Sequence, residues 1–244
     1  ASQDIILVGA FMELKIDGIS VPHKTVITAD SGSIIEIGKA IHGCRSYLAF
    51  RDNIIGTDFL GSVSTYLPSK LGGLEGRMIE KGDFISLEKS DYREDYQEAI
   101  KTDEQASYSH TWLIRVTEGP EYDLLSASSK DAIEDTEYIV DNDSNRIGIR
   151  LNGSPLEIDE HGDMISSPMF PGTIQCPANG QPIVLGPDAQ TLGGYPRIFQ
   201  VSKVDRSLIG QLRPSDQLRF KKISLKEAEE LWRDKATSFP IISN

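Results

Sequence analysis

The sequence predicts a mainly β protein of the barrel or sandwich type that ends in a helix. Apolar and polar residues alternate over many short stretches, and Gly, Pro and Asn separate these stretches. Turn dipeptides such as Asp17-Gly18 and Asn152-Gly153 directly follow alternating stretches. This punctuation favours a barrel or a sandwich over a fold in which strands and helices take turns.

The first part of the chain opens with a hairpin pattern. Apolar residues alternate over 12–16, the turn Asp17-Gly18 follows, and the alternation resumes over 19–21. Further short stretches rich in Ile, Leu and Phe are predicted strands, namely Ser33–Gly38, Ser46–Phe50 and Asp83–Leu87.

The second part of the chain continues the pattern. Trp112, Ile114 and Val116 alternate with polar neighbours, as do Ile147, Ile149 and Leu151 before the turn Asn152-Gly153. Other predicted strands are Pro182–Leu185, Arg197–Val201 and Gln217–Ile223.

Two segments are predicted to be helical. Ser224 and Glu227 form a capping-box pattern. Leu225, Ala228, Leu231 and Trp232 then fall on one helical face, which indicates a helix packed on the barrel. A weaker pattern predicts a second helix over Ser129–Tyr138. The polar segment 88–109 reads as an insertion or a linker between halves.

Composition excludes several classes of function. The formal net charge of −12 provides no basic surface that could displace counterions from nucleic acid or hold an anionic membrane. The longest apolar runs are too short to span a bilayer, and no signal-peptide pattern is present. We therefore expect a cytoplasmic protein with no nucleic-acid or membrane partner.

Cysteine and histidine give no metal-site pattern. Cys44 and Cys176 lie far apart without a CxxC spacing, and no two histidines stand at i and i+4. We expect no metal and a reducing compartment. The chain starts at Ala1 inside a predicted strand, without an initiator Met, so further sequence is expected upstream.

The stretch 171–198 is dense in amides and glycines. Its polar side chains are Gln175, Asn179, Gln181, Asp188, Gln190, Tyr195 and Arg197. Each amide carries a donor and an acceptor, a set that suits recognition of a planar amide, ureido or carboxylate group. The alternative is structural: Asn179-Gly180 and Gly193-Gly194 would be turns, and the glutamines would cap strand ends. Composition alone favours this structural alternative.

The same stretch resembles the signature block of the biotin-dependent carboxyltransferase-like family, GTIQ-P-NGQPIVL followed by D-QT-GGYP. That family includes the C subunit of 5-oxoprolinase, the KipA regulators and the second subunit type of allophanate hydrolase. Three further blocks follow the order of the family: GGLEGR at 72–77 before KGD, RVTEGPEYDLL at 115–125, and SNRIGIRL at 144–151. The opening T-x-Q-D-x-G-R motif of the family is not found.

The resemblance implies a cyclophilin-like β-barrel architecture over 1–244, in two packed halves at 1–90 and 110–244. It implies a part in an ATP-dependent complex that converts 5-oxo-L-proline to L-glutamate, together with a KipI-like B subunit and a LamB/YcsF-like A subunit. ATP would be a co-substrate of the complex, and the chain alone is expected to be inactive. Asp188, Tyr195 and Arg197 would be catalytic.

The resemblance also implies roles in binding. Gln175, Asn179, Gln181, Gln190 and Arg146 would bind substrate. The glycine-rich block could approach a phosphate through Gly73, Gly76 and Arg77, but a tight structural turn with Arg77 in an ion pair is the stronger interpretation.

Two other functions stay open. A KipA-type regulator would bind a KipI-like kinase inhibitor without turnover. A carboxyltransferase component would act on urea or allophanate-type amides, and its biotin would have to arrive on a partner, because no Met-Lys-Met context is present.

Overall fold

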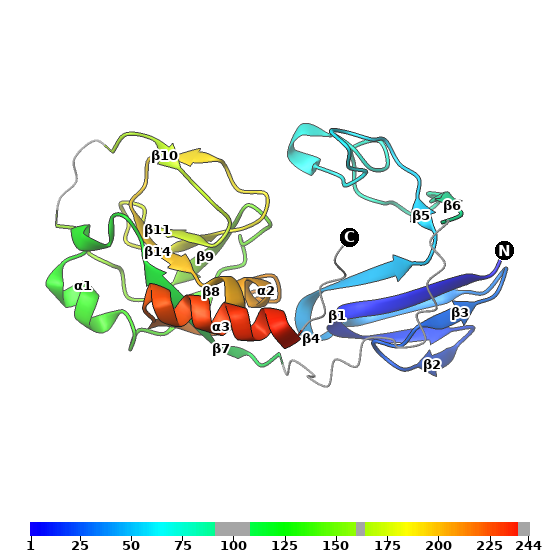
Figure 1. Ribbon diagram of the computed structural model, residues 1–244, viewed down its shortest axis with the longest axis horizontal. Coiled ribbons are helices and arrows are strands. Elements are labelled where there is room, and N and C mark those ends of the chain that lie inside the picture. The colour runs from blue at the N-terminus through cyan, green and yellow to red at the C-terminus, as the bar shows by residue number, and fades with distance from the viewer. Residues whose placement is uncertain (91–107, 160–163, 239–244) are drawn as a thin grey trace. The chain divides into compact units, whose positions relative to one another are not determined.

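The computed structural model describes residues 1–90, 108–159 and 164–238. The chain divides into two compact units, residues 1–107 and 108–244 (Figure 1). The predicted linker 88–109 falls mostly on residues outside the described ranges. The two predicted halves, 1–90 and 110–244, therefore stay a prediction.

The first unit is built on two long antiparallel strands, β1 (Gln3–Ile16) and β4 (Ile35–Phe50). Two short strands, β2 (Ile19–Val21) and β3 (Ile27–Ala29), also pair with β1. Between β1 and β2 the predicted turn forms, with Asp17 at φ 51° and Gly18 at φ 79°. Positive φ at both turn positions matches the right-handed twist of the paired strands.

Two predicted strands of this unit, Ser33–Gly38 and Ser46–Phe50, are parts of the single strand β4. The prediction of two strands was wrong because the residues between them also pair with β1, for example His42 with Phe11. Shifts in the pairing register between Gly9 and Leu14 allow the two long strands to stay paired. Gly9 has φ 103°, and a Cβ there would lie 2.5 Å from the Arg45 carbonyl oxygen. Glycine is therefore required at this bulge.

The remaining regular elements of the first unit are short. They are β5 (Asn53–Ile54), β6 (Leu87–Glu88) and a 3₁₀ turn, η1 (Leu67–Ser69). The predicted strand Asp83–Leu87 was wrong except at Leu87. Asp83 instead ends a turn, because its backbone N–H donates to the Glu80 carbonyl and its carboxylate accepts the Glu80 N–H at 2.6 Å.

The second unit is a closed barrel of seven strands in the order β11-β12-β9-β8-β15-β7-β14. In chain order these are β7 (Thr111–Glu118), β8 (Tyr138–Val140), β9 (Gly148–Asn152), β11 (Thr173–Gln175), β12 (Ile183–Leu185), β14 (Arg197–Val201) and β15 (Gln217–Lys222). Neighbours are antiparallel except β15 and β7, which are parallel. A separate pair, β10 (Ser167–Pro168) and β13 (Leu192–Gly193), lies off the barrel. Gly193 was expected in a turn and is in this strand pair.

Alternation along the strands fills the barrel with large apolar side chains. Tyr138, Phe199 and Phe220 are at most 1% exposed, and their rings contact one another with centroids 5.4 and 6.1 Å apart. Burial on this scale is the main force that holds the barrel closed. The predicted fold class, mainly β with a barrel and a C-terminal helix, is confirmed.

In the described part of the second unit, four short helices lie between barrel strands, and a longer helix follows the last strand. They are η2 (Tyr122–Leu124), α1 (Ala127–Ala132), η3 (Lys203–Asp205), α2 (Arg206–Ile209) and α3 (Leu225–Ser238). The helix predicted at Ser129–Tyr138 is α1, which starts earlier because the Ser126 side chain caps the Ser129 N–H. Tyr138 belongs to β8 instead.

The C-terminal helix α3 is confirmed with one correction. The Glu227 N–H donates to Ser224 Oγ at 3.1 Å, as the capping pattern predicts. Trp232 is partly buried and carries the Lys203 ammonium 4.1 Å from its ring centroid, so α3 packs on η3. Leu225 is 76% exposed and lies off the packed face.

Candidate functional site

A pocket of about 630 Å³ lies against the outer wall of the barrel in the second unit. Strand β9 buries Ile149 and Leu151 in the barrel, so Arg150 and Asn152 face outward on the same side. The other side of the pocket is formed by the end of β11 and by the loop that leads to β12, the strand that pairs with β9. The polar side chains that line it are Asp141, Asp143, Arg150, Asn152, Gln175, Asn179, Gln181 and Tyr195.

Gln175 is the most deeply placed amide of this set. The residue is only 5% exposed. Its Oε1 accepts a long hydrogen bond of 3.5 Å from Gln190 Nε2. Among the described residues its own Nε2 donates to no acceptor. Among the described residues, the fully buried side-chain polar atoms without a partner are Tyr138 Oη and Ser202 Oγ, so solvent reaches Gln175 Nε2. A ligand oxygen in the pocket could accept its hydrogen bond in place of water.

Two other predicted amides build the pocket wall. Gln181 accepts the Gly153 N–H at 3.0 Å and donates to the Gly153 carbonyl at 3.1 Å. Asn179 Oδ1 accepts the Gln181 backbone N–H at 3.1 Å, and Gly180 completes the turn with φ 72°. These contacts are those of the structural alternative, and binding of substrate by either side chain stays a prediction.

Asp141 brings a negative charge to the pocket rim. Its carboxylate accepts the Asp143 N–H at 2.8 Å and the Asn152 amide at 2.5 Å. These hydrogen bonds lower the pKa of Asp141 below its ordinary value, so the group is ionised at neutral pH.

Tyr195 lines the same pocket and is 48% exposed. The other two residues predicted to be catalytic do not line it. Asp188 forms an ion pair with Arg146, with Nε–Oδ2 and Nη2–Oδ1 distances of 2.7 and 3.0 Å. Arg197 borders a smaller cavity of about 220 Å³. The residues of the sequence block are therefore divided among three places, which are the 630 Å³ pocket, the 220 Å³ cavity beside Arg197, and the Asp188–Arg146 ion pair, which lines neither.

Arg197 is held by a carboxylate that the sequence did not connect to it. Its guanidinium donates to both carboxylate oxygens of Glu121, at 2.8 and 2.6 Å, and its backbone N–H donates to the same residue at 2.9 Å. This paired geometry is strong and directional. It gives Arg197 a structural task on β14, whereas its catalytic role stays a prediction.

Acid should weaken the Glu121–Arg197 brace. Hydrogen bonds from Arg197 hold the pKa of Glu121 below its ordinary value of 4.5. Ionised Glu121 therefore contributes stability that is fully present above pH 4.5 and is lost as the pH falls through the lowered folded-state pKa. Stability measured by urea unfolding should fall more steeply below pH 4.5 in the wild type than in Glu121→Gln. Parallel pH profiles for the two proteins would contradict this expectation.

The predicted phosphate-binding residues lie in the first unit. Gly73 and Gly76 have φ of 57° and 67°, and the Gly76 N–H donates to the Gly72 carbonyl. The Arg77 guanidinium donates to both oxygens of Asp83, at 2.7 and 2.9 Å. This geometry accords with the interpretation as a structural turn with an ion pair, and phosphate binding stays a prediction.

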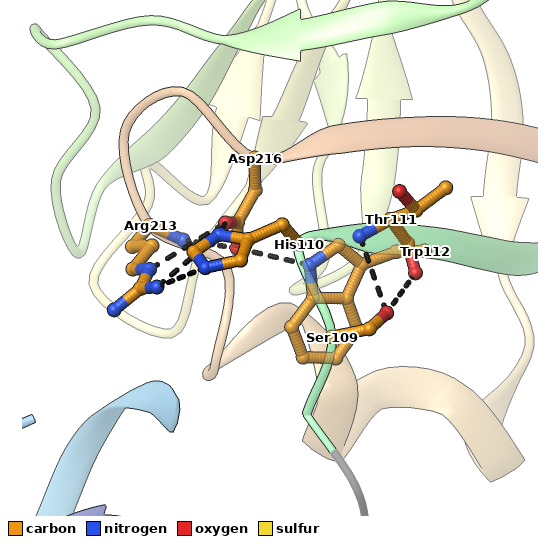
Figure 2. Close-up of polar contacts among 6 residues, drawn as sticks. All are labelled: Ser109, His110, Thr111, Trp112, Arg213 and Asp216. Carbon is orange, nitrogen blue, oxygen red and sulfur yellow. Dashed lines mark hydrogen bonds and ion pairs between the residues drawn. The ribbon is translucent and has the colours of Figure 1, made fainter. Parts of the chain in front are cut away.

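A second polar cluster, which the sequence did not suggest, lies where β7 begins (Figure 2). Asp216 is 1% exposed and accepts hydrogen bonds from the Trp112 indole at 2.9 Å and from the Arg213 backbone N–H at 3.1 Å. His110 Nδ1 lies 3.0 Å from Asp216 Oδ1, and Arg213 Nη2 lies 2.6 Å from His110 Nε2.

This cluster resembles a base oriented by a carboxylate, but its geometry blocks that use. Arg213 Nη2 lies 2.6 Å from Nε2 and 3.1 Å from Nδ1, so the guanidinium lies against the imidazole ring. A substrate would have to displace the Arg213 side chain to reach these nitrogens. The cluster instead ties the start of β7 to the turn before β15.

The polar pocket residues that sequence reasoning missed are Arg150, Asn152, Asp141 and Asp143. The outward positions of β9 could have identified Arg150 and Asn152, because they alternate with Ile149 and Leu151. Within the described ranges, no three His, Cys, Asp or Glu side chains come together as metal ligands would. No helix in the part of the chain that the structure describes is long and apolar enough to cross a membrane.

The second unit is thus a closed β barrel with an amide-lined pocket against its outer wall. Comparison with known protein families identifies the family of this chain. The family described as "Carboxyltransferase domain, subdomain A and B" matches residues 1–222, so the chain belongs to this family.

Relatives with known names agree with this assignment. The chain is 35% identical over 235 residues to the 5-oxoprolinase C subunit of Escherichia coli (strain K12), across 96% of this chain and 74% of that protein. Its identity to the protein of the same name from Haemophilus influenzae is 31%, across 92% of this chain and 71% of that protein. The urea amidolyase of Saccharomyces cerevisiae is 27% identical across 93% of this chain, which is 13% of that longer protein.

Solved structures show the same fold. The Kluyveromyces lactis urea carboxylase superposes with a TM-score of 0.88 at 25% identity, over 98% of this chain and 23% of that chain. The K. lactis urea amidolyase gives the same TM-score at 24% identity, over 98% of this chain and 16% of that chain. These likenesses place the fold among those of urea carboxylase and urea amidolyase.

Proposed function

We propose that this chain is the C subunit of an ATP-dependent 5-oxoprolinase, which converts 5-oxo-L-proline to L-glutamate. The observation that carries the proposal is the 35% identity to a 5-oxoprolinase C subunit across nearly the whole chain. The amide-lined pocket is the part of the chain that would recognise the lactam. In this proposal the cytoplasmic enzyme also contains a KipI-like B subunit and a LamB/YcsF-like A subunit.

The chemistry explains why such a chain would need partners. An unstrained lactam is a poor electrophile, and transfer of a phosphoryl group from ATP to its oxygen would make the ring carbon open to attack by water. The C–N bond would then break, the nitrogen would take a proton to become the amine, and the carbonyl carbon would be left as an acyl phosphate. A second water would hydrolyse this acyl phosphate to the carboxylate and phosphate, and ADP would leave. Among the described residues that line the pocket there is no histidine, cysteine or serine to act as a nucleophile or its base. Recognition and orientation of the lactam are therefore the tasks proposed for this chain.

Reconstitution tests the proposal. The purified chain alone should hydrolyse neither 5-oxoproline nor ATP. A mixture with its A-type and B-type partners should release phosphate and glutamate in equal amounts, and only when 5-oxo-L-proline is present. Turnover by the chain alone, or a full complex without 5-oxoproline-dependent ATP hydrolysis, would overturn the proposal.

Carboxyl transfer to urea-type amides is the second candidate. The superposition on the K. lactis urea carboxylase favours it. The chain would then move a carboxyl group from biotin carried on a partner to the amide nitrogen. The same preparation, given a carboxylated biotin carrier and urea, should form a carboxylated urea under this alternative. A KipA-type regulator would give no product in either assay.

A further inference from the structure

Arg150 differs in its contacts from several other arginines of the barrel unit. It lies on β9 opposite Ile183 of β12, is exposed, and lines the 630 Å³ pocket. Its neighbours Ile149 and Leu151 are buried in the barrel, which fixes the direction of its side chain toward the outer wall. The strand therefore presents a guanidinium group to the pocket from a rigid element.

The partners of comparable arginines show what Arg150 lacks. Arg115, Arg146 and Arg197 each hold a carboxylate through two hydrogen bonds, with Asp205, Asp188 and Glu121 respectively. The Arg150 side chain makes no hydrogen bond or ion pair with any described residue. Its N–H donors, arranged as a fork, are thus open toward the pocket, and this geometry matches a carboxylate.

Gln175 supplies a hydrogen-bond donor to the pocket that Arg150 lines. It is 5% exposed, lines the pocket, and keeps an amide nitrogen that donates to no described acceptor. Solvent reaches this nitrogen, so a ligand oxygen in the pocket can accept its hydrogen bond in place of water. The pocket therefore offers one cation and one nearly buried amide to the same small molecule.

The acidic residues of the pocket limit the kinds of ligand that would bind there. Asp141 is ionised, since hydrogen bonds and, to a smaller extent, the charge of Arg150 lower its pKa. Its oxygens are turned toward Asn152 and the Asp143 N–H. Asp143 is exposed and adds a second negative charge at the rim. A simple anion would be opposed by these carboxylates, whereas a molecule that has an N–H donor beside its carboxylate can face both signs of charge.

We propose that Arg150 binds the carboxylate of a small lactam or amide acid whose amide group is recognised by Gln175. This inference rests on the proposed function and deepens it, because 5-oxoproline carries a carboxylate next to a lactam. Arg150 would then be the residue that separates lactam acids from neutral amides of similar size.

Binding to the full chain tests this role directly. Wild-type protein is titrated by NMR or calorimetry with 5-oxo-L-proline and with 2-pyrrolidinone, which has the same ring without the carboxylate. The wild type should bind 5-oxoproline roughly 10- to 100-fold more tightly, the range expected for a hydrogen-bonded charge pair. Arg150→Gln should lose that preference, and Arg150→Lys should restore only part of it because lysine lacks the fork.

Arg219→Gln is the matched control, because Arg219 is also exposed on a barrel strand but lies outside the pocket and faces Glu137 at 3.6 Å. It should keep the wild-type preference. Equal affinity of Arg150→Gln and wild type for 5-oxoproline, or a wild type that does not distinguish the two lactams, would overturn the role of Arg150.

The reconstituted complex separates this inference from the proposed function. If the wild-type complex turns over 5-oxoproline and Arg150→Gln raises KM roughly 10- to 100-fold, both stand. If the complex is active and Arg150→Gln leaves KM unchanged, the role of Arg150 is wrong and the proposed function stands. An inactive wild-type complex sinks the proposed function, and the binding preference of the isolated chain then still decides the role of Arg150.

Discussion

Replacing Asp216 with asparagine should lower the free energy of unfolding by about 3 kcal/mol, because each buried donor left without an acceptor costs about 1–3 kcal/mol. Asp216 is 1% exposed and accepts from the Trp112 indole and the Arg213 backbone. Asparagine keeps one oxygen but turns an NH₂ group toward donors. The start of β7 should therefore lose its attachment to the turn before β15.

Urea unfolding followed by tryptophan fluorescence measures this loss, since Trp112 itself donates to Asp216. Asp188→Asn is the matched control. Asp188 pairs with Arg146, whose side chain is 51% exposed, so its loss should cost less than about 1 kcal/mol. Similar unfolding midpoints for the two variants would show that the buried cluster contributes little.

Replacing Gln175 with leucine should lower kcat/KM of the reconstituted complex for 5-oxoproline by about 10- to 100-fold, equivalent to about 1–3 kcal/mol. Leucine fills a similar volume but offers the substrate amide neither a donor nor an acceptor. Stability should hardly change, because the substitution removes a nearly buried amide whose nitrogen has no partner among the described residues.

Gln217→Leu provides the comparison, as the same substitution on barrel strand β15 outside the pocket. It should leave kcat/KM near the wild-type value. If Gln175→Leu instead lowers the melting temperature and leaves kcat/KM unchanged, the side chain serves the end of β11 and not a ligand.

The architecture of the barrel was largely predictable, because it depends on local alternation. Ile149 and Leu151 face inward on β9 as their spacing indicates, and Ser224 caps α3 as its pattern predicts. The single strand β4 was not predictable, since its continuity depends on pairing with β1 across polar residues. Pairing between distant strands leaves no mark in the local sequence.

The candidate site was only partly predictable for the same reason. The block that contains Gln175 and Tyr195 does supply pocket residues. Arg197, however, meets Glu121, which is 76 residues away, and Asp188 meets Arg146, which is 42 residues away. A sequence shows which residues are charged, but only the fold determines which of these residues pair with each other. The outward position of Arg150 on β9 could be read from the alternation, but only the fold shows that, unlike Arg146 and Arg197, it has no hydrogen-bonded carboxylate among the described residues.

The parallel pairing of β15 with β7 has a consequence for biosynthesis. The first strand of the barrel unit joins the last, with Thr111 opposite Gln217 and Val116 opposite Lys222. On a ribosome, residues 108–216 emerge while β7 still lacks one of its neighbours. The barrel cannot close until residues 217–222 have been synthesised. Contacts between residues so distant in sequence form slowly. A nascent chain stalled before Gln217 would expose an open sheet edge, the kind of surface that holdase chaperones protect from aggregation.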